Sequence, residues 1–409
     1  MNAAGESIVC AEDAGEAAGD SAKAIEVLVG CAGGAEGAGS HYERSRLVVV
    51  TAGQPVARIL PGADVKLGEN VALDGDGVTV RAVAAGVLRV EGNSVRVAQA
   101  VELAGDVDFS TGNIDCPHDV VVRGSILDLF RVRSGGTVHV GRSIEAAEVC
   151  AAGDIVAGQA IAGKEKGRCI AGGSVRAKLM TAAHIEAGGD VAAVAEIAHC
   201  RIVCGGALRA PGAAVYGGEI AARGGAVCGE LGCAGGARTI IAAGIDQELR
   251  RLAGEHVPRV LAEMRQAAKV RQTVEPLLRN QRSLTAQQKE KATELLFQAG
   301  EMEERNRSVV ETLRRRREES RLSQREEIRV LKTLYAGVVV RFAELEAAVP
   351  CDTGGPVSLV PRRRAGGGHI AMVVAGGREV MLETRSTKDE TMRALEELLT
   401  MCGGEGAGT

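Results

Sequence analysis

The chain has 409 residues, of which 55 are Gly, 2% are aromatic and 45% are hydrophobic. Glycine is about twice as frequent as in ordinary globular proteins, so small aliphatic side chains must fill a thin core. The formal net charge of −4 provides no global field that would attract nucleic acid or an anionic membrane. No run of about 18 apolar residues is present, which excludes a helix that spans a bilayer.

The N-terminal part predicts a flexible leader followed by a small domain. No signal peptide is visible, and the 11 Cys show no regular framework, which is typical of reduced thiols in a cytoplasmic protein. Residues 1–44 carry eight acidic and two basic side chains among Ala and Gly, so we expect them to repel one another and stay disordered. Between 45 and 104, short Val-rich runs separated by Gly predict a β-rich domain.

Branched apolar residues recur at intervals of six between residues 105 and 244. The spacing is regular from Ile114 to Ile144, and after a five-residue step to Val149 it resumes with Ile155 and Ile161. The pattern continues less strictly at Val175, Ile185, Val191, Ile197, Ile202 and Leu208. Gly-rich tetrapeptides such as GGTV and GGSV return every 16 to 20 residues, which is close to three intervals of six.

This period predicts a chain wound into triangular coils of about 18 residues. Each coil would contain three short strands, each with one branched residue pointing inward. Glycine suits the corners because it adopts positive φ without strain and lets neighbouring coils stack closely. We therefore predict a three-sided, single-stranded parallel β-helix of seven or eight coils, whereas an ordinary sandwich would produce such regular spacing only by chance.

Residues 245–333 contain few Gly and many Arg, Glu and Leu, with apolar residues at helical spacing. A capping box from Thr285 to Gln288 predicts a second helix that begins near Ala286 and runs for about 45 residues. Two long helices with a tight connection predict an antiparallel coiled-coil hairpin. We expect Pro258 near the start of the first helix and Pro276 to kink or interrupt it.

The C-terminal part predicts a short β segment at 334–349 and an extension at 350–409. The extension contains a loop rich in Gly, Pro and Arg at 351–368, a β pair, and an amphipathic helix in KDETMRALEELLTM. The fold class that follows is mainly β with a long α hairpin.

Together these pieces resemble the bacterial flagellar assembly protein A (FapA) family over about 45–345. The resemblance rests on stretches such as GDVDFSTGNID at 105–115, FRVRSGGTVHVGRSIEAAEV at 130–149 and GELGCAGGARTIIAAG at 229–244. It implies a parallel β-helix, usually right-handed, with an N-terminal β domain and a protruding helical hairpin. It also implies a role in flagellar assembly, cell polarity or protein localisation, without a known reaction. The leader, the Cys-rich coils and the extension after Pro350 depart from that pattern.

Cysteines are the first candidates for chemistry. Possible zinc thiolates, with His199 adjacent, are Cys200, Cys204, Cys228 and Cys233. Neither pair has the CxxC spacing, and Cys150, Cys169 and Cys204 fall where Ala or Val would serve. We interpret these thiols as small core filler, with redox sensing as the remaining alternative.

Four histidines lie on the repeat: His118, His139, His184 and His199. Hexad-repeat acyltransferases use a catalytic His in a cleft between subunits and commonly carry a long extruded loop. Here the clear irregularity is short, at Lys164–Lys166. Alternation places His139 outward beside inward Val138, so we predict exposed, non-catalytic histidines.

The remaining polar candidates have simple structural interpretations. Corner residues that lack the spacing of calcium-binding β-rolls are Asp106, Asp108, Asn113 and Asp115, which we interpret as turn formers. Arg314–Arg317 covers a whole helical turn near several Glu, which predicts a solvated face, and Arg362–Arg364 lies in the predicted loop. Contact with an acidic partner or nucleic acid is the alternative, although no interleaved aromatics favour base stacking.

No phosphate-binding loop, nucleophile elbow or metalloprotease motif is present. We therefore expect no catalytic, cofactor-binding or metal-binding residues. The sequence predicts a non-enzymatic cytoplasmic scaffold or localisation protein that binds other proteins, or further copies of itself, through the β-helix faces and the hairpin. We expect it to bind no nucleic acid and not to span the membrane. The alternatives are a hexapeptide-repeat-like acyltransferase and a polymerising cytoskeletal β-helix of the bactofilin or MinC kind, which exposed strand edges would favour.

Overall fold

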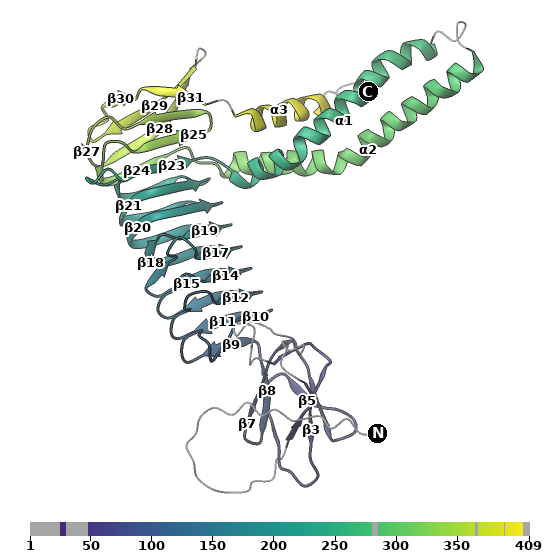
Figure 1. The fold of residues 1–409 in the computed structure, drawn as a ribbon, viewed down its shortest axis with the longest axis vertical. Coiled ribbons are helices and arrows are strands. Elements are labelled where there is room, and N and C mark those ends of the chain that lie inside the picture. The colour runs from purple at the N-terminus through teal and green to yellow at the C-terminus, as the bar shows by residue number, and fades with distance from the viewer. Residues whose placement is uncertain (1–24, 30–47, 280–284, 365–366, 388, 404–409) are drawn as a thin grey trace. The chain divides into compact units, whose positions relative to one another are not determined.

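The computed structural model describes residues 25–29, 48–279, 285–364, 367–387 and 389–403. These residues form two compact units (Figure 1). The first contains the residues up to 220 together with 228–239, and the second contains 221–227 and the residues from 240 onwards. The chain carries a β-solenoid of about 8 turns and a packed pair of helices, which confirms the predicted fold class. No helix in the described part of the chain is both long and apolar enough to cross a membrane.

The first unit begins with two small sheets. Their strand orders are β1-β3-β6-β5 and β2-β7-β8-β4. They share a core of small branched residues that includes Val56, Val80, Val95 and Val97. The strands are β1 (Ile25–Val27), β2 (Val49–Val50), β3 (Pro55–Ile59), β4 (Lys66–Leu67), β5 (Val71–Leu73), β6 (Thr79–Ala82), β7 (Gly86–Glu91) and β8 (Ser94–Ala98).

Strand β1 lies inside the segment that the sequence predicts to be a flexible leader. It pairs with β3 in antiparallel register, with Ile25 opposite Ile59, and Ile25 and Val29 pack against the core of the two sheets. The prediction of disorder is wrong at residues 25–29. Although acidic residues surround them, their apolar side chains pack against the core of the two sheets. The other residues of the predicted leader, 1–24 and 30–44, lie outside the described part of the chain.

The solenoid begins earlier than the predicted residue 105. Strand β9 (Ala100–Leu103) already pairs in parallel with β11, and Val101 lies beside Val120. Successive short strands then stack on one another (Figure 1). They are β10 (Ile114–Cys116), β11 (Asp119–Val122), β12 (Arg131–Ser134), β13 (Val138–Val140), β14 (Glu148–Ala151), β15 (Ile155–Ala157), β16 (Ala160–Ala162), β17 (Arg168–Ala171), β18 (Val175–Thr181), β19 (His184–Ala187), β20 (Val191–Cys204), β21 (Leu208–Ala222), β22 (Ala226–Leu231) and β23 (Thr239–Ala243).

The apolar residues of the repeat form three stacked columns inside the solenoid. The first contains Val120, Val138, Ile155, Val175 and Val191. The second contains Ile114, Val132, Val149, Cys169, Ile185 and Ile202. The third contains Val107, Ile126, Ile144, Ile161, Met180 and Ile197. None of these side chains is more than 1% exposed, so the interval of six corresponds to one side of a three-sided coil.

The corner glycines are required because adjacent coils approach closely. A Cβ atom at Gly172 would lie 2.2 Å from the carbonyl oxygen of Ala152, and one at Gly188 would lie 2.1 Å from that of Gly172. Neither glycine has a positive φ. Of the two reasons that the sequence suggests for Gly at corners, close stacking therefore applies at these positions and left-handed backbone does not.

Corner side chains also bond the next coil. An Oδ1 atom accepts a hydrogen bond from a backbone N–H of the following coil at Asp106 (from Ser125, 2.7 Å), Asn113 (from Arg131, 2.8 Å), Asp119 (from Thr137, 2.7 Å), Asp154 (from Ser174, 2.7 Å) and Asp190 (from Ala207, 2.7 Å). Asp108 instead bonds Ser110 in its own turn at 2.8 Å. The prediction of local turn formers thus holds for Asp108, whereas Asp106 and Asn113 link one coil to the next.

The second unit contains the helical pair α1 (Gln247–Arg279) and α2 (Ala286–Ser323). Helix α2 begins where the sequence predicts, and Thr285 and Gln288 make both hydrogen bonds of the capping box. It has 38 residues, fewer than predicted, because strand β24 starts at Ile328 inside the predicted hairpin. Both Pro258 and Pro276 lie inside α1. The helix therefore starts well before Pro258, contrary to prediction, and is not interrupted at Pro276. A kink at Pro276 stays a prediction.

The remaining strands of the second unit are β24 (Ile328–Leu334), β25 (Val339–Phe342), β26 (Leu345–Ala348), β27 (Thr353–Gly354), β28 (Val357–Arg364), β29 (Gly367–Val374), β30 (Glu379–Met381) and β31 (Thr384–Ser386). Strands β28 and β29 pair antiparallel, with Val357 opposite Val374, so the predicted loop at 351–368 is largely a strand. Its buried Val357 and Leu359 alternate with partly exposed neighbours. The amphipathic helix predicted near the C-terminus is α3 (Glu390–Gly403).

Candidate functional site

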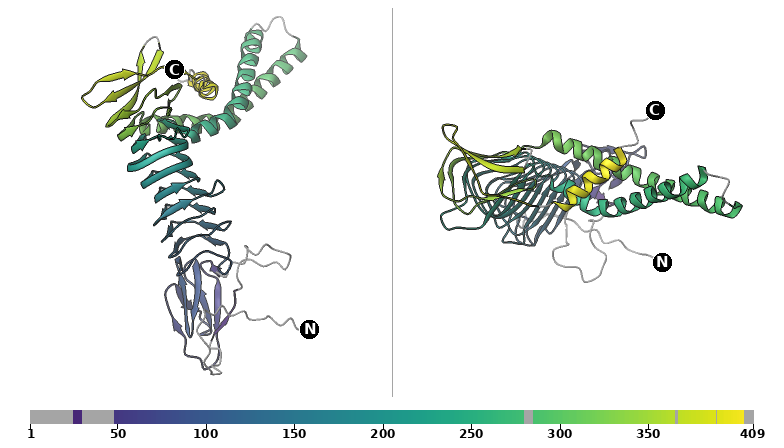
Figure 2. Two further views of the ribbon diagram at one scale, coloured as in Figure 1. Left: turned by 60° about the vertical axis from the view of Figure 1, so that its left-hand side comes forward. Right: turned by 90° about the horizontal axis from the view of Figure 1, so that it is seen from above.

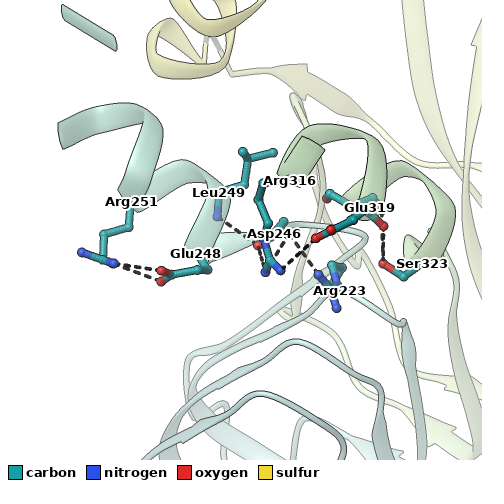
Figure 3. A network of polar contacts seen from close by, with 9 residues as sticks. Arg223, Asp246, Glu248, Leu249, Arg251, Arg316, Glu319 and Ser323 are labelled. Carbon is teal, nitrogen blue, oxygen red and sulfur yellow. Dashed lines mark hydrogen bonds and ion pairs between the residues drawn. The ribbon is translucent and has the colours of Figure 1, made fainter. Parts of the chain in front are cut away.

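The helical pair begins, within the second unit, at a buried carboxylate, Asp246. Its Oδ1 atom accepts a hydrogen bond from the Leu249 N–H at 3.0 Å, so Asp246 caps the N-terminus of α1. Its Oδ2 atom lies 3.1 Å from Nη1 of Arg223 and 3.3 Å from Nη2 of Arg316 on α2. One side chain therefore joins the chain before the hairpin, the first turn of α1 and the last turns of α2 (Figure 3).

The environment of Asp246 favours its ionised form. The side chain is only 5% exposed, and burial by itself opposes ionisation. The Leu249 N–H and the two guanidinium groups outweigh burial and hold the pKa of Asp246 below its ordinary value of 3.8. Two backbone bonds, Arg325 N to Arg223 O at 3.0 Å and Ala226 N to Glu327 O at 3.0 Å, tie the exit of α2 to the same segment.

The half of the hairpin near Asp246, which we name the lower half, has an apolar core shared by three helices. Its buried residues are Leu249, Ala253, Val257, Val260 and Leu261 of α1, Val310 and Leu313 of α2, and Leu395 and Leu398 of α3. Helix α3 lies along this part of the pair (Figure 2). Because α3 comes from the C-terminal extension, the extension completes the core that anchors the hairpin.

The far half, residues 264–279 and 285–306, is packed differently, and we name it the upper half. Its buried residues are Ala267 and Val274 of α1 and Ala299 and Asn306 of α2. Arg271 and Glu303 form a two-bond ion pair across the helices, with Nε–Oε1 at 2.8 Å, and hydrogen bonding to Glu303 raises the pKa of Arg271. Small side chains and polar pairs thus replace the leucine-rich core of the lower half.

A cavity of about 850 Å³ lies beside the lower half, within the second unit. Its wall includes the start of α1, the end of α2, the turn at 342–345 and α3. Three of its arginines pair with acidic neighbours in the same wall: Arg250 with Asp389 at 2.7 Å, Arg317 with Glu396 at 2.9 Å, and Arg363 with Glu326 at 2.7 Å. These charges neutralise one another, so the cavity shows no preference for a ligand of either sign.

A family model described as the Flagellar Assembly Protein A beta solenoid domain matches residues 99–355. The chain belongs to the FapA family. The match includes the solenoid strands, both hairpin helices and the returning strands β24 to β26. The FapA family is linked to flagellar assembly and is not a known enzyme family. A search of the curated proteins found no match, and neither did a search of the solved structures.

The cysteines singled out in the sequence are mostly buried in the FapA solenoid. Cys169 occupies a column position between Val149 and Ile185, and burial raises the pKa of its thiol and that of Cys228 to about 12. Cys150 points outward and is half-buried. Within the described ranges, no three His, Cys, Asp or Glu side chains are grouped closely enough to hold a metal, and the interpretation of these cysteines as filler stays a prediction.

The four histidines of the repeat are not brought together. His139 has Val121 and Val156 as strand neighbours, whereas His184 has Arg168 and Arg201. The side chains of His139 and His199 are exposed as predicted. His184 is half-buried, and so is His118, whose Nε2 atom makes no hydrogen bond to any described residue; for these two the predicted exposure is wrong.

The irregularity at Lys164–Lys166 is a tight turn. The Lys166 N–H bonds the Gly163 carbonyl at 2.9 Å, and the Lys164 amine bridges Asp128 and Glu145 at 2.8 and 2.9 Å. The short segment is therefore held against the solenoid and does not extend as a loop over a cleft.

The two basic runs differ from the sequence prediction. Arg314 and Arg315 are exposed, but Arg316 bonds Asp246 and Arg317 bonds Glu396, so only half of the run is a solvated face. Arg362 and Arg363 belong to strand β28, not to a loop, and pair with Glu379 and Glu326. Sequence reasoning missed Asp246, although an Asp directly before a helix is a recognised N-cap signal.

Proposed function

We propose that this FapA-family chain is a non-enzymatic cytoplasmic scaffold or localisation protein, linked to flagellar assembly or cell polarity, whose upper hairpin half binds its partner. The proposal is supported by the contrast between the two halves of the hairpin. The lower half has an apolar core shared with α3, and the upper half has only small buried residues while exposing Phe297 at 66% and Leu277 at 49%. Aromatic residues are enriched in protein–protein interfaces, so the exposed Phe297 favours a binding role for the upper half.

The two rival functions have less support. Acyl transfer would need a histidine in a cleft beneath an extruded loop, and the separated histidines and the tight Lys164 turn do not favour this arrangement. A filament built by the stacking of solenoid ends would need free strand edges. At the N-terminal end of the solenoid, β9 pairs with β11. The carbonyl oxygen of Glu102 in β9 accepts a hydrogen bond from Nη2 of Arg89 in β7 at 2.9 Å, so the other edge of β9 is partly covered, which does not favour end-to-end growth.

The experiment is excision of the upper half at a point where the two helices already touch. Asn306 Nδ2 donates to Glu263 Oε2 at 2.6 Å, so residues 266–304 can be replaced by a short Gly-Ser turn between adjacent backbones. This change leaves the lower core, α3 and the Asp246 network in place. As a matched control, the segment 280–284 alone is replaced by the same turn.

We expect the excised protein to keep its solenoid and its melting temperature within a few degrees, and to lose its position in the cell and its captured partners. The 280–284 control should keep both. Circular dichroism, localisation of a tagged chain and affinity capture from the native cell measure these outcomes. Normal localisation and capture by the excised protein would show that the upper half is only a spacer.

A further inference from the structure

The face of α2 that points away from α1 carries an acidic stripe around one aromatic residue. Its exposed members recur at spacings of four and three and are Glu290, Glu294, Phe297, Glu301 and Glu304. These residues lie on the side opposite Ala299, which is buried against α1. Glu304 makes only an exposed pair with Arg307 at 3.0 Å. Among the described residues, Glu290 and Glu301 form no ion pair.

The corresponding face of α1 is basic around one apolar residue. Its exposed members, again at spacings of three and four, are Lys269, Gln272, Pro276 and Arg279. They lie opposite the buried Ala267 and Val274. Within the described part of the chain, neither Lys269 nor Arg279 has an acidic partner. Each hairpin therefore presents one acidic face and one basic face, on opposite sides.

The ion pair between Arg271 and Glu303 sets the relative height of the two faces. Counting equal steps toward the hairpin tip at 1.5 Å per residue, Pro276 is level with the turn that carries Phe297. By the same count, Lys269, Gln272 and Arg279 each lie within one residue of the level of Glu304, Glu301 and Glu294, respectively. The basic face of one hairpin thus matches the acidic face of another in charge and in the position of its apolar centre.

We propose that the upper half binds a second copy of this chain, with the outward face of α1 in one hairpin packed against the outward face of α2 in the next. The proposal rests on the proposed binding role of the upper half and names its partner. In this arrangement the hairpins lie side by side and parallel, and Pro276 contacts Phe297 of the neighbouring copy. Three polar pairs flank that contact: Lys269 with Glu304, Gln272 with Glu301, and Arg279 with Glu294. Pairing of two α2 faces is disfavoured, because it would place Glu against Glu.

The geometry also determines the kind of assembly. Since the two faces lie on opposite sides of one hairpin, the contact is head-to-tail and every copy keeps one free face, so copies form a ring or an open row. The contact spans about 15 Å of each helix, which is small for a stable interface. Association is therefore reversible and depends on protein concentration and on salt.

The test uses charge reversal in the full chain, with sedimentation velocity and light scattering over a range of protein concentrations. One variant carries Lys269→Glu and Arg279→Glu, so that both of its faces are acidic. The other carries Glu294→Lys and Glu304→Lys, so that basic residues replace the two carboxylates expected to pair with Arg279 and Lys269. The matched control is Lys291→Glu, an exposed charge on the same helix outside the stripe. Circular dichroism verifies that helix content is retained.

We expect the wild type and the control to increase in mass with concentration, and each reversed variant alone to associate at least tenfold more weakly. An equimolar mixture of the two variants should associate again, because each acidic face then meets a basic one. Phe297→Ser removes the apolar contact and should weaken self-association. Mixing this variant with either charge-reversed variant should not restore association.

A wild type that stays monomeric, or reversed variants that fail to recover on mixing, would overturn the proposal. Association that survives the Lys269 and Arg279 changes would indicate a different surface. If the wild type is monomeric while excision of residues 266–304 still abolishes localisation, the proposed function stands and its partner is another protein. If the wild type associates as described but excision leaves localisation intact, self-association is real and the proposed function is wrong.

Discussion

The solenoid and the upper half of the hairpin are both long and regular, but they are stabilised in different ways. In the solenoid, every interval of six places one side chain in a column that is at most 1% exposed. In the upper half, few residues are buried, and Arg271 and Glu303 form an ion pair between the two helices.

The difference indicates where each region tolerates change. Each coil of the solenoid buries its apolar residues against the neighbouring coils and leaves its polar residues outside. The inner column positions therefore determine the stability of the solenoid. The upper half contributes little apolar burial, and its outward charges are available for contacts with other molecules. A substitution should therefore reduce stability in the solenoid and reduce association in the upper half.

The largest expected effect is at an inner column position. Val138 is fully buried between Val120 and Ile155, so Val138→Asp would place an unpaired carboxylate in a dry interior and destabilise the fold by about 3–5 kcal/mol. His139 is exposed one residue away, and His139→Asp should cost less than about 1 kcal/mol. Chemical denaturation measures both. Equal losses would contradict the inward and outward assignment and the coil register with it.

A corner glycine should come next. Gly172→Ala would bring a methyl group to 2.2 Å from the Ala152 carbonyl oxygen, and separating the two coils should cost about 2–3 kcal/mol. A methyl group at Gly105 would meet no atom within 4 Å, and Gly105 has no positive φ, so Gly105→Ala serves as a control that should be close to neutral. A neutral Gly172→Ala would show that the coils are less tightly stacked than described.

Much of the solenoid can be predicted from the sequence, because one physical cause, the burial of a branched side chain every six residues, acts at each coil. Ile114, Val138 and Ile161 are all buried as the spacing predicts. Boundaries are harder to predict, because they depend on tertiary pairing. Strand β9 joins the solenoid through its contact with β11, and no local signal at residue 100 distinguishes it from the strands before it.

The candidate site is predictable only in part. The capping box at Thr285 marks the start of α2 correctly, since capping is local. Strand β24 and the role of Arg316 cannot be predicted from the local sequence, because both depend on residues far away in the chain. Arg316, for example, bonds Asp246, which is 70 residues away in sequence. A run of arginines looks uniformly solvated in the sequence until the fold brings a carboxylate to one of them.

A smaller effect is expected at the base of the hairpin. Asp246→Asn keeps the shape of the cap and removes the charge between Arg223 and Arg316, which should destabilise the protein by about 1–2 kcal/mol at neutral pH. Because the pKa of Asp246 is lowered from 3.8, its contribution is present above about pH 4 and is lost as the pH falls through the lowered value. The variant should therefore lose less stability than the wild type on acidification. Glu255→Gln, an exposed change on the same helix, is the control. Equal acid sensitivity of the Asn variant and the wild type would contradict this role of Asp246.

The smallest expected effect is that of removing metal. If Cys169 and Cys228 are core filler, chelation should leave the melting temperature unchanged and purified protein should hold far less than one zinc per chain. Both thiols have a pKa of about 12 because they are buried, so at pH 8 almost none of either is thiolate and a thiol reagent should react slowly with them. Cys351 is exposed and should react first in the folded protein, with Cys169 and Cys228 following only on unfolding. Two effects of a chelator would contradict this prediction: a lower melting temperature, or reactivity of Cys200 and Cys228 in the folded chain. Either result would show that thiols of the solenoid bind a metal and are not core filler.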